Sequence, residues 1–94
     1  MKQYRVGLIG SGYIGRAHSI ALQEVGAVFP EVATPVCEIL ADHDASAAAK
    51  SAAAMGFRRS TGDWRELVAD PAVDIGDICS RNYLHREMAL AAIA

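Results

Sequence analysis

The segment that most constrains this chain is a glycine-rich turn between an apolar run and a segment with helical periodicity. The turn is Gly10-Ser11-Gly12-Tyr13-Ile14-Gly15, and it follows the apolar run Val6-Gly7-Leu8-Ile9. A G-x-G-x-x-G turn in this strand, turn and helix order is typical of dinucleotide-binding folds. In that interpretation Gly10 permits the tight turn, Gly12 lets a pyrophosphate approach the backbone, and Gly15 lets the helix pack against the strand. The alternative interpretation is a glycine-rich turn that holds no ligand.

Short apolar segments alternate with segments of helical periodicity along the rest of the chain. Strands are expected at residues 4–9, 36–41, 57–60 and 74–80. Helices are expected from Ile14 to Gly26, from Asp44 to Gly56, from Asp63 to Ala69, and over residues 84–92. This alternation predicts an α/β fold with right-handed connections between parallel strands. We therefore expect a Rossmann-type doubly wound parallel sheet with about four strands in the order 3-2-1-4.

The length and charge of the chain exclude several classes of protein. The 94 residues carry a net charge of −2 with positive and negative residues interspersed, so no basic face is predicted for nucleic acid or for an anionic membrane. No apolar run approaches the ~18 residues that a membrane-spanning helix needs, and we expect a cytoplasmic protein. Cys37 and Cys79 fall in apolar segments without metal-ligand spacing, which favours buried, reduced thiols.

The chain is also expected to be part of a larger unit. A dinucleotide fold has six strands, and this chain stops near the helix that would deliver the fifth. We interpret residues 1–94 as the N-terminal part of an NAD(P)-binding domain, without a C-terminal substrate domain. The strand around Ile75 and Ile78 would then be an exposed, largely apolar edge, which predicts self-association into a homo-oligomer through that edge or by exchange of the last helix.

Asp42 is the candidate for recognition of the ribose. It follows the apolar segment 36–41, where this fold places a carboxylate that accepts the ribose hydroxyls. A carboxylate there repels a 2′-phosphate, so NAD is favoured over NADP. The alternative is that Asp42 is only a turn residue or a helix cap.

The histidines and the single tryptophan are given structural roles. His18, His43 and His85 lack metal-ligand spacing, so no metal is predicted. His18 is expected on the apolar side of the first helix as a packing histidine, with no carboxylate spaced to tune it. Trp64 is expected in the core, the alternative being a place beside the adenine.

Several spaced motifs together resemble those of the Gfo/Idh/MocA oxidoreductases, the family of glucose-fructose oxidoreductase and inositol dehydrogenase. Besides the glycine turn and Asp42, they are Val28-Phe29-Pro30, Asp63-Trp64-Arg65-Glu66-Leu67-Val68, Ala69-Asp70-Pro71-Ala72-Val73-Asp74 and Asn82-Tyr83-Leu84-His85. The resemblance covers essentially the whole chain. It implies a Rossmann domain that binds NAD or NADP and a second domain that holds a sugar, a polyol or a related substrate.

The resemblance assigns cofactor-binding roles to individual residues. Gly10, Gly12 and Gly15 match the pyrophosphate loop with Tyr13 and Ile14 beside it, and Asp42 matches the ribose carboxylate. Asn82 and His85 match the loop near the nicotinamide half. The family's proton-handling lysine lies in a Glu-Lys-Pro motif after a fifth strand, so the resemblance implies no catalytic residue in this chain and no catalysis by it alone.

Two positions depart from the family pattern, which has an apolar residue where Gly76 stands and a proline where Arg81 stands. Glycine weakens a strand, and arginine frees a φ angle that proline fixes. Arg81 is expected to be solvated, the alternative being that it reaches a phosphate. The rival functions are a nucleotide-binding sensor or scaffold without catalysis, a methyltransferase-like domain, and a truncated domain that folds but binds nothing tightly.

Overall fold

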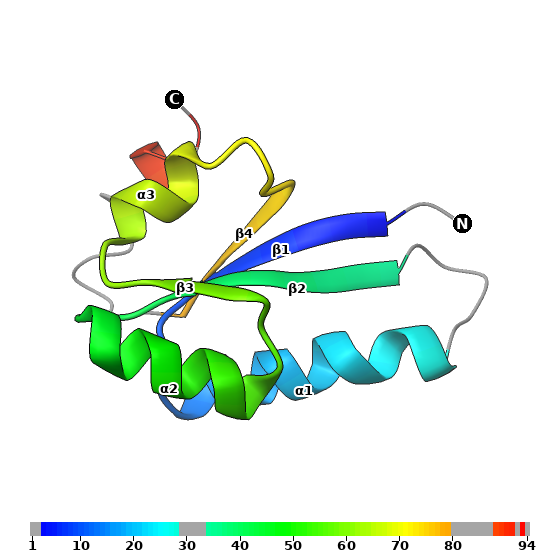
Figure 1. Ribbon diagram of the computed structural model, residues 1–94. Helices are drawn as coiled ribbons and strands as arrows, with labels where there is room; N and C mark the ends of the chain where they lie inside the picture. Colours follow the sequence, from blue (N-terminus) through cyan, green and yellow to red (C-terminus); the bar gives the residue numbers. More distant parts are fainter. Residues whose placement is uncertain (1–2, 29–33, 80–87, 92, 94) are drawn as a thin grey trace.

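Four parallel strands form the centre of the computed structural model, which describes residues 3–28, 34–79, 88–91 and 93 (Figure 1). The strands are β1 (Gln3–Ile9), β2 (Thr34–Ala41), β3 (Arg59–Thr61) and β4 (Ile75–Ile78). They pair in the order β3-β2-β1-β4, and every pairing is parallel. The predicted doubly wound sheet with strand order 3-2-1-4 is confirmed.

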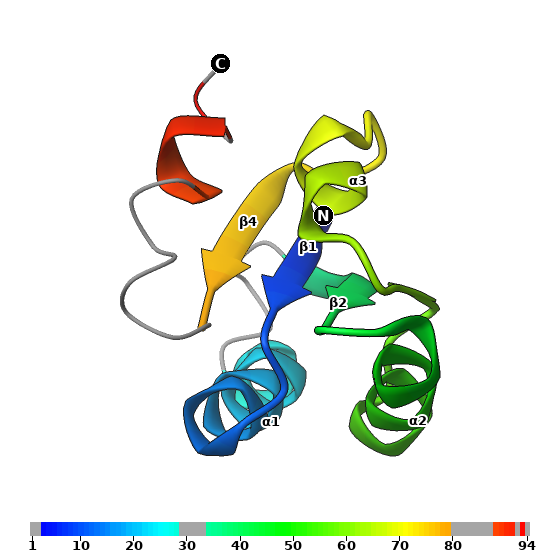
Figure 2. The same ribbon diagram turned by 90° about the vertical axis from the view of Figure 1, so that its left-hand side faces the viewer.

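Helices cover both faces of this sheet. Helices α1 (Tyr13–Val28) and α2 (Ala45–Met55) lie on one face, and α3 (Trp64–Ala69) lies on the other (Figure 2). Met88 packs in the same cluster as Leu67 of α3, so the helical residues 88–91 share the face of α3. Among the described residues, no helix combines the length and the apolar character that crossing a bilayer requires.

The alternating side chains of β1 and β2 build one hydrophobic core on each face. Leu8 and Leu40 are fully buried under α2, while Ile9 and Ala41 belong to the core under α3. Gly7 lies below α3, where an added Cβ would come within 2.7 Å of the Leu67 Cδ2 atom. The missing side chain at residue 7 therefore lets α3 pack directly on β1.

The predicted helix starts at Asp44 and Asp63 and the predicted helix end at Gly56 are confirmed. One predicted helix end is not. Asp44 accepts a hydrogen bond from the Ala47 amide at 2.7 Å, and Gly56 ends α2 with a φ of 78°. The Asp63 carboxylate likewise accepts from the Arg65 amide at the start of α3. The prediction that Gly26 ends the first helix is wrong, because α1 continues to Val28.

All four strands differ from the expected ranges. β1 begins one residue earlier than expected, β2 begins at Thr34 and includes Pro35, β3 covers residues 59–61 rather than 57–60, and β4 covers only residues 75–78. Phe57, expected in the third strand, instead fills the core beneath α2. Of the predicted last helix, residues 84–87 and 92 lie outside the described residues.

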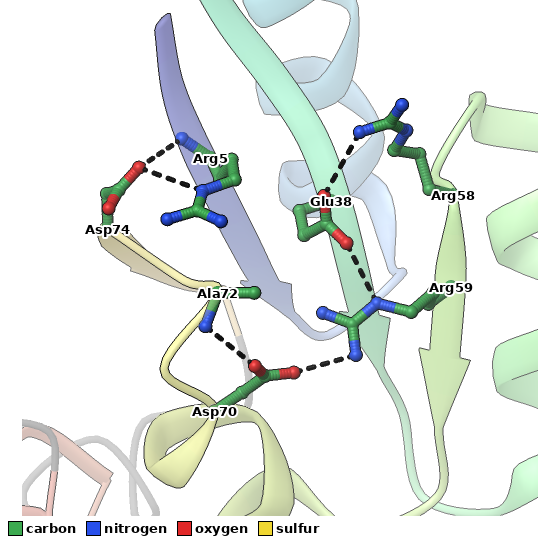
Figure 3. A network of polar contacts seen from close by, with 7 residues as sticks. All are labelled: Arg5, Glu38, Arg58, Arg59, Asp70, Ala72 and Asp74. Atoms are coloured by element: carbon green, nitrogen blue, oxygen red, sulfur yellow. Dashed lines mark hydrogen bonds and ion pairs between the residues drawn. The ribbon is translucent and has the colours of Figure 1, made fainter.

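A bulge at Glu38 sets which residues of β2 face each core. Val6 pairs with Cys37 and Gly7 pairs with Ile39, so Glu38 is the extra residue. Glu38 is buried, and its carboxylate accepts a hydrogen bond from the Arg59 Nε at 2.8 Å. Figure 3 shows Arg59 between Glu38 and Asp70, with a second ion pair of 2.8 Å to Asp70. The network ties β2 and the start of β3 to the carboxyl end of α3.

Candidate functional site

The glycine turn has the backbone geometry that a tight strand-to-helix connection needs. Gly10 has a φ of 98°, a left-handed value that favours glycine, and its amide donates to the Ala41 carbonyl at 2.8 Å. Helix α1 begins at Tyr13, so Tyr13 and Ile14 form its first turn, directly after Gly12. The free amides at this helix end are a suitable place for an anion.

Gly12 and Gly15 are glycines for opposite reasons. A Cβ added at Gly12 would meet no atom within 4 Å, so this position opens onto free space. A Cβ added at Gly15 would lie 2.2 Å from the Gly10 carbonyl oxygen and 3.8 Å from the Cys79 Cβ. Gly15 thus lets the first turn of α1 pack against the turn, and Gly12 leaves room for a ligand to approach the backbone.

Asp42 lies at the end of β2, across from the turn, and is held by three donors. The Ser11 hydroxyl donates to one carboxylate oxygen, and the His43 amide donates to the other at 2.7 Å. The His43 ring is also within 3.1 Å. Partial burial raises the pKa of Asp42, but the hydrogen bonds from Ser11 and His43 outweigh it, so the pKa lies below its ordinary value. Asp42 is therefore ionised at neutral pH and oriented toward the turn.

A cleft of about 850 Å³ joins the turn to Asp42. Its lining includes Gly10, Ser11 and Gly12 from the turn, Asp42 and His43 after β2, Gly62 to Arg65 before and within α3, and Cys79 and Met88. The size is within the range of small-molecule and cofactor sites. The open position at Gly12 has room for a pyrophosphate, and the Asp42 carboxylate can accept hydrogen bonds from ribose hydroxyls. Adenosine diphosphate contains both groups.

The start of α3 adds a residue that sequence reasoning did not assign to the cleft. The Arg65 guanidinium lies 4.5 Å from the centroid of the Trp64 ring, and both residues line the cleft. Trp64 packs against the core under α3, as expected, and its place beside an adenine stays a prediction. Ser11 was missed as well, although a hydroxyl between the first two motif glycines is a usable signal because it faces the following strand end.

His18 departs from the prediction, since it has a carboxylate partner. Its Nδ1 atom lies 2.7 Å from an Asp77 carboxylate oxygen, and its side chain is 47% exposed rather than packed in the core. The two residues are 59 positions apart, and only the pairing of β4 beside β1 brings them together.

Both cysteines are free and partly buried. Burial raises the pKa of Cys37. Burial, with the negative charge of Asp77 as a further cause, raises the pKa of Cys79 to about 12. Neither is a reactive thiolate in this state.

Some predicted residues cannot be placed. Asn82, His85 and Arg81 lie outside the described residues. At Gly76 an added Cβ would meet no atom within 4 Å, so the departure from the family pattern removes no contact with the described residues.

A scan against protein-family models decides the family. Residues 4–94 match the Gfo/Idh/MocA model, described as an oxidoreductase family with an NAD-binding Rossmann fold. The chain belongs to the Gfo/Idh/MocA oxidoreductase family. It is an NAD-binding Rossmann domain of that family, as the resemblance in sequence predicted.

Curated and solved relatives support this assignment. Levoglucosan dehydrogenase from Pseudarthrobacter phenanthrenivorans is 42% identical over 93 residues, which are 98% of this chain and 24% of that protein. A structure of levoglucosan dehydrogenase with NADH and L-sorbose superposes with a TM-score of 0.95 at 41% identity, covering 98% of this chain and 25% of that one. For myo-inositol dehydrogenase from Lactobacillus casei, with NAD(H) and myo-inositol, the TM-score is 0.81 at 26% identity, covering 99% and 26%. The chain thus spans about a quarter of the length of these relatives.

Proposed function

We propose that this chain binds NAD in the cleft between the glycine turn and α3, as the dinucleotide-binding part of a sugar or polyol dehydrogenase. The observation that carries the proposal is the ionised, hydrogen-bonded Asp42 facing an open glycine turn across one cleft. When bound, NAD supplies the hydride-accepting ring for oxidation of an alcohol carbon.

Different residues of the cleft bind different parts of NAD. The backbone at Gly10, Gly12 and the start of α1 receives the pyrophosphate, and Gly15 keeps that helix end in place. Asp42 accepts the ribose hydroxyls and disfavours a 2′-phosphate, so NAD is preferred to NADP. Trp64 and Arg65 form a flat wall for the adenine. Tyr13, Ile14, Asn82 and His85 keep the family's cofactor-binding roles as part of this proposal.

Fluorescence of Trp64 tests the binding, because it is the single tryptophan and it lines the cleft. We expect saturable quenching with NAD, weaker binding of NADP, and no response to S-adenosylmethionine. Saturation by S-adenosylmethionine alone would indicate a methyltransferase-like domain. No saturation by any of the three would show a folded domain that binds none of them, contrary to the proposal.

The oxidoreductase role needs a second experiment, since the chain covers a quarter of its relatives and carries no assigned catalytic residue. We expect a chimera of this chain and the remaining part of levoglucosan dehydrogenase to form NADH from levoglucosan or a related sugar. The isolated chain should bind NAD without turnover. A chimera that folds and binds NAD but never reduces it would favour a sensor or scaffold.

Self-association through β4 is the proposed oligomeric contact, with a second copy of this chain as the partner. Among the described strands, β4 pairs only with β1, and Ile75 at its start is 48% exposed. We expect Ile75→Lys to reduce the oligomer measured by light scattering, while Ile20→Lys, at an exposed position on α1, leaves it unchanged. A monomeric wild-type chain at tens of micromolar would contradict this.

A cytoplasmic location is proposed from the two free thiols, which are typical of a reducing compartment. Cell fractionation of the tagged protein tests it, and recovery with secreted or membrane fractions would overturn it.

A further inference from the structure

Three side chains with different metal-binding atoms meet beside the carboxyl end of β4. They are His18 from α1, Asp77 from β4, and Cys79 immediately after β4. The His18 Nδ1 is 2.7 Å from Asp77 Oδ2 and 3.3 Å from the Cys79 sulfur, and that sulfur is 3.5 Å from Asp77 Oδ1. The two short contacts of Asp77 use different carboxylate oxygens, and one ligand atom from each of the three residues lies within 4.8 Å of the other two.

The sheet fixes part of this cluster and solvent reaches the rest. The Cys79 amide donates to the Ile9 carbonyl at 2.8 Å, so the thiol is held where β4 ends beside β1. The side chains of His18 and Asp77 are 47% and 25% exposed, which leaves an entry path for an ion. The cluster is separate from Asp42 but adjoins the cleft, because Cys79 lines it.

We propose that His18, Asp77 and Cys79 bind a zinc ion with one ligand atom each. Zinc accepts imidazole nitrogen, thiolate sulfur and carboxylate oxygen together, whereas magnesium and calcium prefer oxygen ligands only. Three protein ligands leave a fourth position for water, as in zinc sites that are open to solvent.

The distances are close to those of a tetrahedral site. Zinc–ligand bonds of 2.0–2.3 Å place neighbouring ligand atoms roughly 3.4–3.6 Å apart in a tetrahedron. The distances from the Cys79 sulfur to His18 Nδ1, 3.3 Å, and to Asp77 Oδ1, 3.5 Å, already agree with this. With Oδ1 as the ligand oxygen, the 2.7 Å hydrogen bond between His18 and the other oxygen, Oδ2, must break, and the exposed ring of His18 has room to turn toward the ion.

The charge around Cys79 also suits a cation. The Asp77 carboxylate, 3.5 Å from the Cys79 sulfur, supplies a negative charge beside the thiol. A divalent ion bound there offsets this charge and deprotonates the coordinating thiol. The proton leaves to solvent as the sulfur–metal bond forms, and no redox step is involved.

Cobalt(II) titration of the 94-residue chain, with a phosphine reductant and no nucleotide, tests the site. We expect a near-ultraviolet thiolate-to-cobalt charge-transfer band that saturates at one ion per chain and disappears when zinc is added. Cys79→Ser should abolish the band. His18→Gln, at an exposed position, should retain the fold by circular dichroism and weaken binding at least about tenfold.

Two matched variants test whether the other thiol or another histidine binds the ion instead. Cys37→Ser removes the other thiol, and His43→Gln removes a histidine whose ring contacts Asp42 and Asp44. Both should keep the band and the affinity. Absence of the band in the folded wild-type chain, its persistence in Cys79→Ser, or its loss in Cys37→Ser would overturn the proposal. Because no nucleotide is present, these outcomes are independent of NAD binding.

Discussion

Asp42 and Asp77 both lie near the carboxyl ends of strands in the same sheet, yet their partners give them different chemistry. Asp42 is held by a hydroxyl and a backbone amide, which are donors that a ribose can supplement. Asp77 is held by an imidazole and a thiol, which are groups that can share a metal ion with it. In the two proposed roles, neighbouring donors rather than strand position decide what a carboxylate at this edge can bind.

Gly15 lies between the two sites, and its replacement should have the largest effect. In Gly15→Ala the new Cβ would lie 2.2 Å from a backbone oxygen that cannot move without opening the turn. We expect a loss of about 3 kcal/mol or more in the free energy of unfolding, measured by urea denaturation. Gly12→Ala, with free space around the Cβ, should lose little. Equal losses in the two variants would contradict the described packing.

The same substitution at Gly12 and at Gly76 tests whether the open space beside Gly12 is occupied by the ligand. Gly12→Val and Gly76→Val both add a side chain where no atom lies within 4 Å. Only Gly12→Val should weaken NAD binding, by on the order of 100-fold, because it fills the approach to the turn. Trp64 fluorescence measures both affinities. If the Gly76 variant loses NAD binding equally, the cleft is not the binding site.

Exchanging each carboxylate for its amide tests the division of roles. Asp42→Asn should weaken NAD binding about tenfold, the cost of losing charge-assisted hydrogen bonds, and should raise the affinity for NADP relative to NAD. Asp77→Asn should leave the ratio of the two nucleotide affinities unchanged while weakening cobalt binding. An unchanged ratio in Asp42→Asn would mean that Asp42 is only a turn residue.

Acid stability should show the smallest effect. Hydrogen bonds outweigh burial at Asp42 and lower its pKa, and at Asp70 the Ala72 amide and then Arg59 lower it. A folded pKa below the unfolded value of about 3.9 means that the unfolded chain binds more protons. These contributions are complete above about pH 4 and are lost as pH falls through the folded values. Unfolding measured from pH 6 to 2 should therefore be flatter in Asp42→Asn and Asp70→Asn, and unchanged slopes would contradict these pKa directions.

Local signals predicted most of the fold and the glycine side of the site. The caps at Asp44, Asp63 and Gly56 and the short apolar strands are encoded within a few residues, and the glycine turn carries its own geometry. The contact of His18 with Asp77 was missed because it depends on strand order across 59 residues. The continuation of α1 past Gly26 was missed because glycine is tolerated inside a helix at a cost of about 1 kcal/mol.

The bulge at Glu38 has a consequence for anyone who redesigns cofactor preference here. Successive residues of a strand point to alternate faces of the sheet. The single additional residue in β2 therefore determines which face each residue between it and Asp42 occupies. Removing residue 38 would restore regular pairing, but it would turn the side chains of Ile39, Leu40 and Ala41 to the opposite faces of the sheet. Each side chain would then point into the other core. A different loop can therefore be grafted after β2 only if the number of residues in the strand is kept. Otherwise the grafted side chain will point to the opposite face of the sheet.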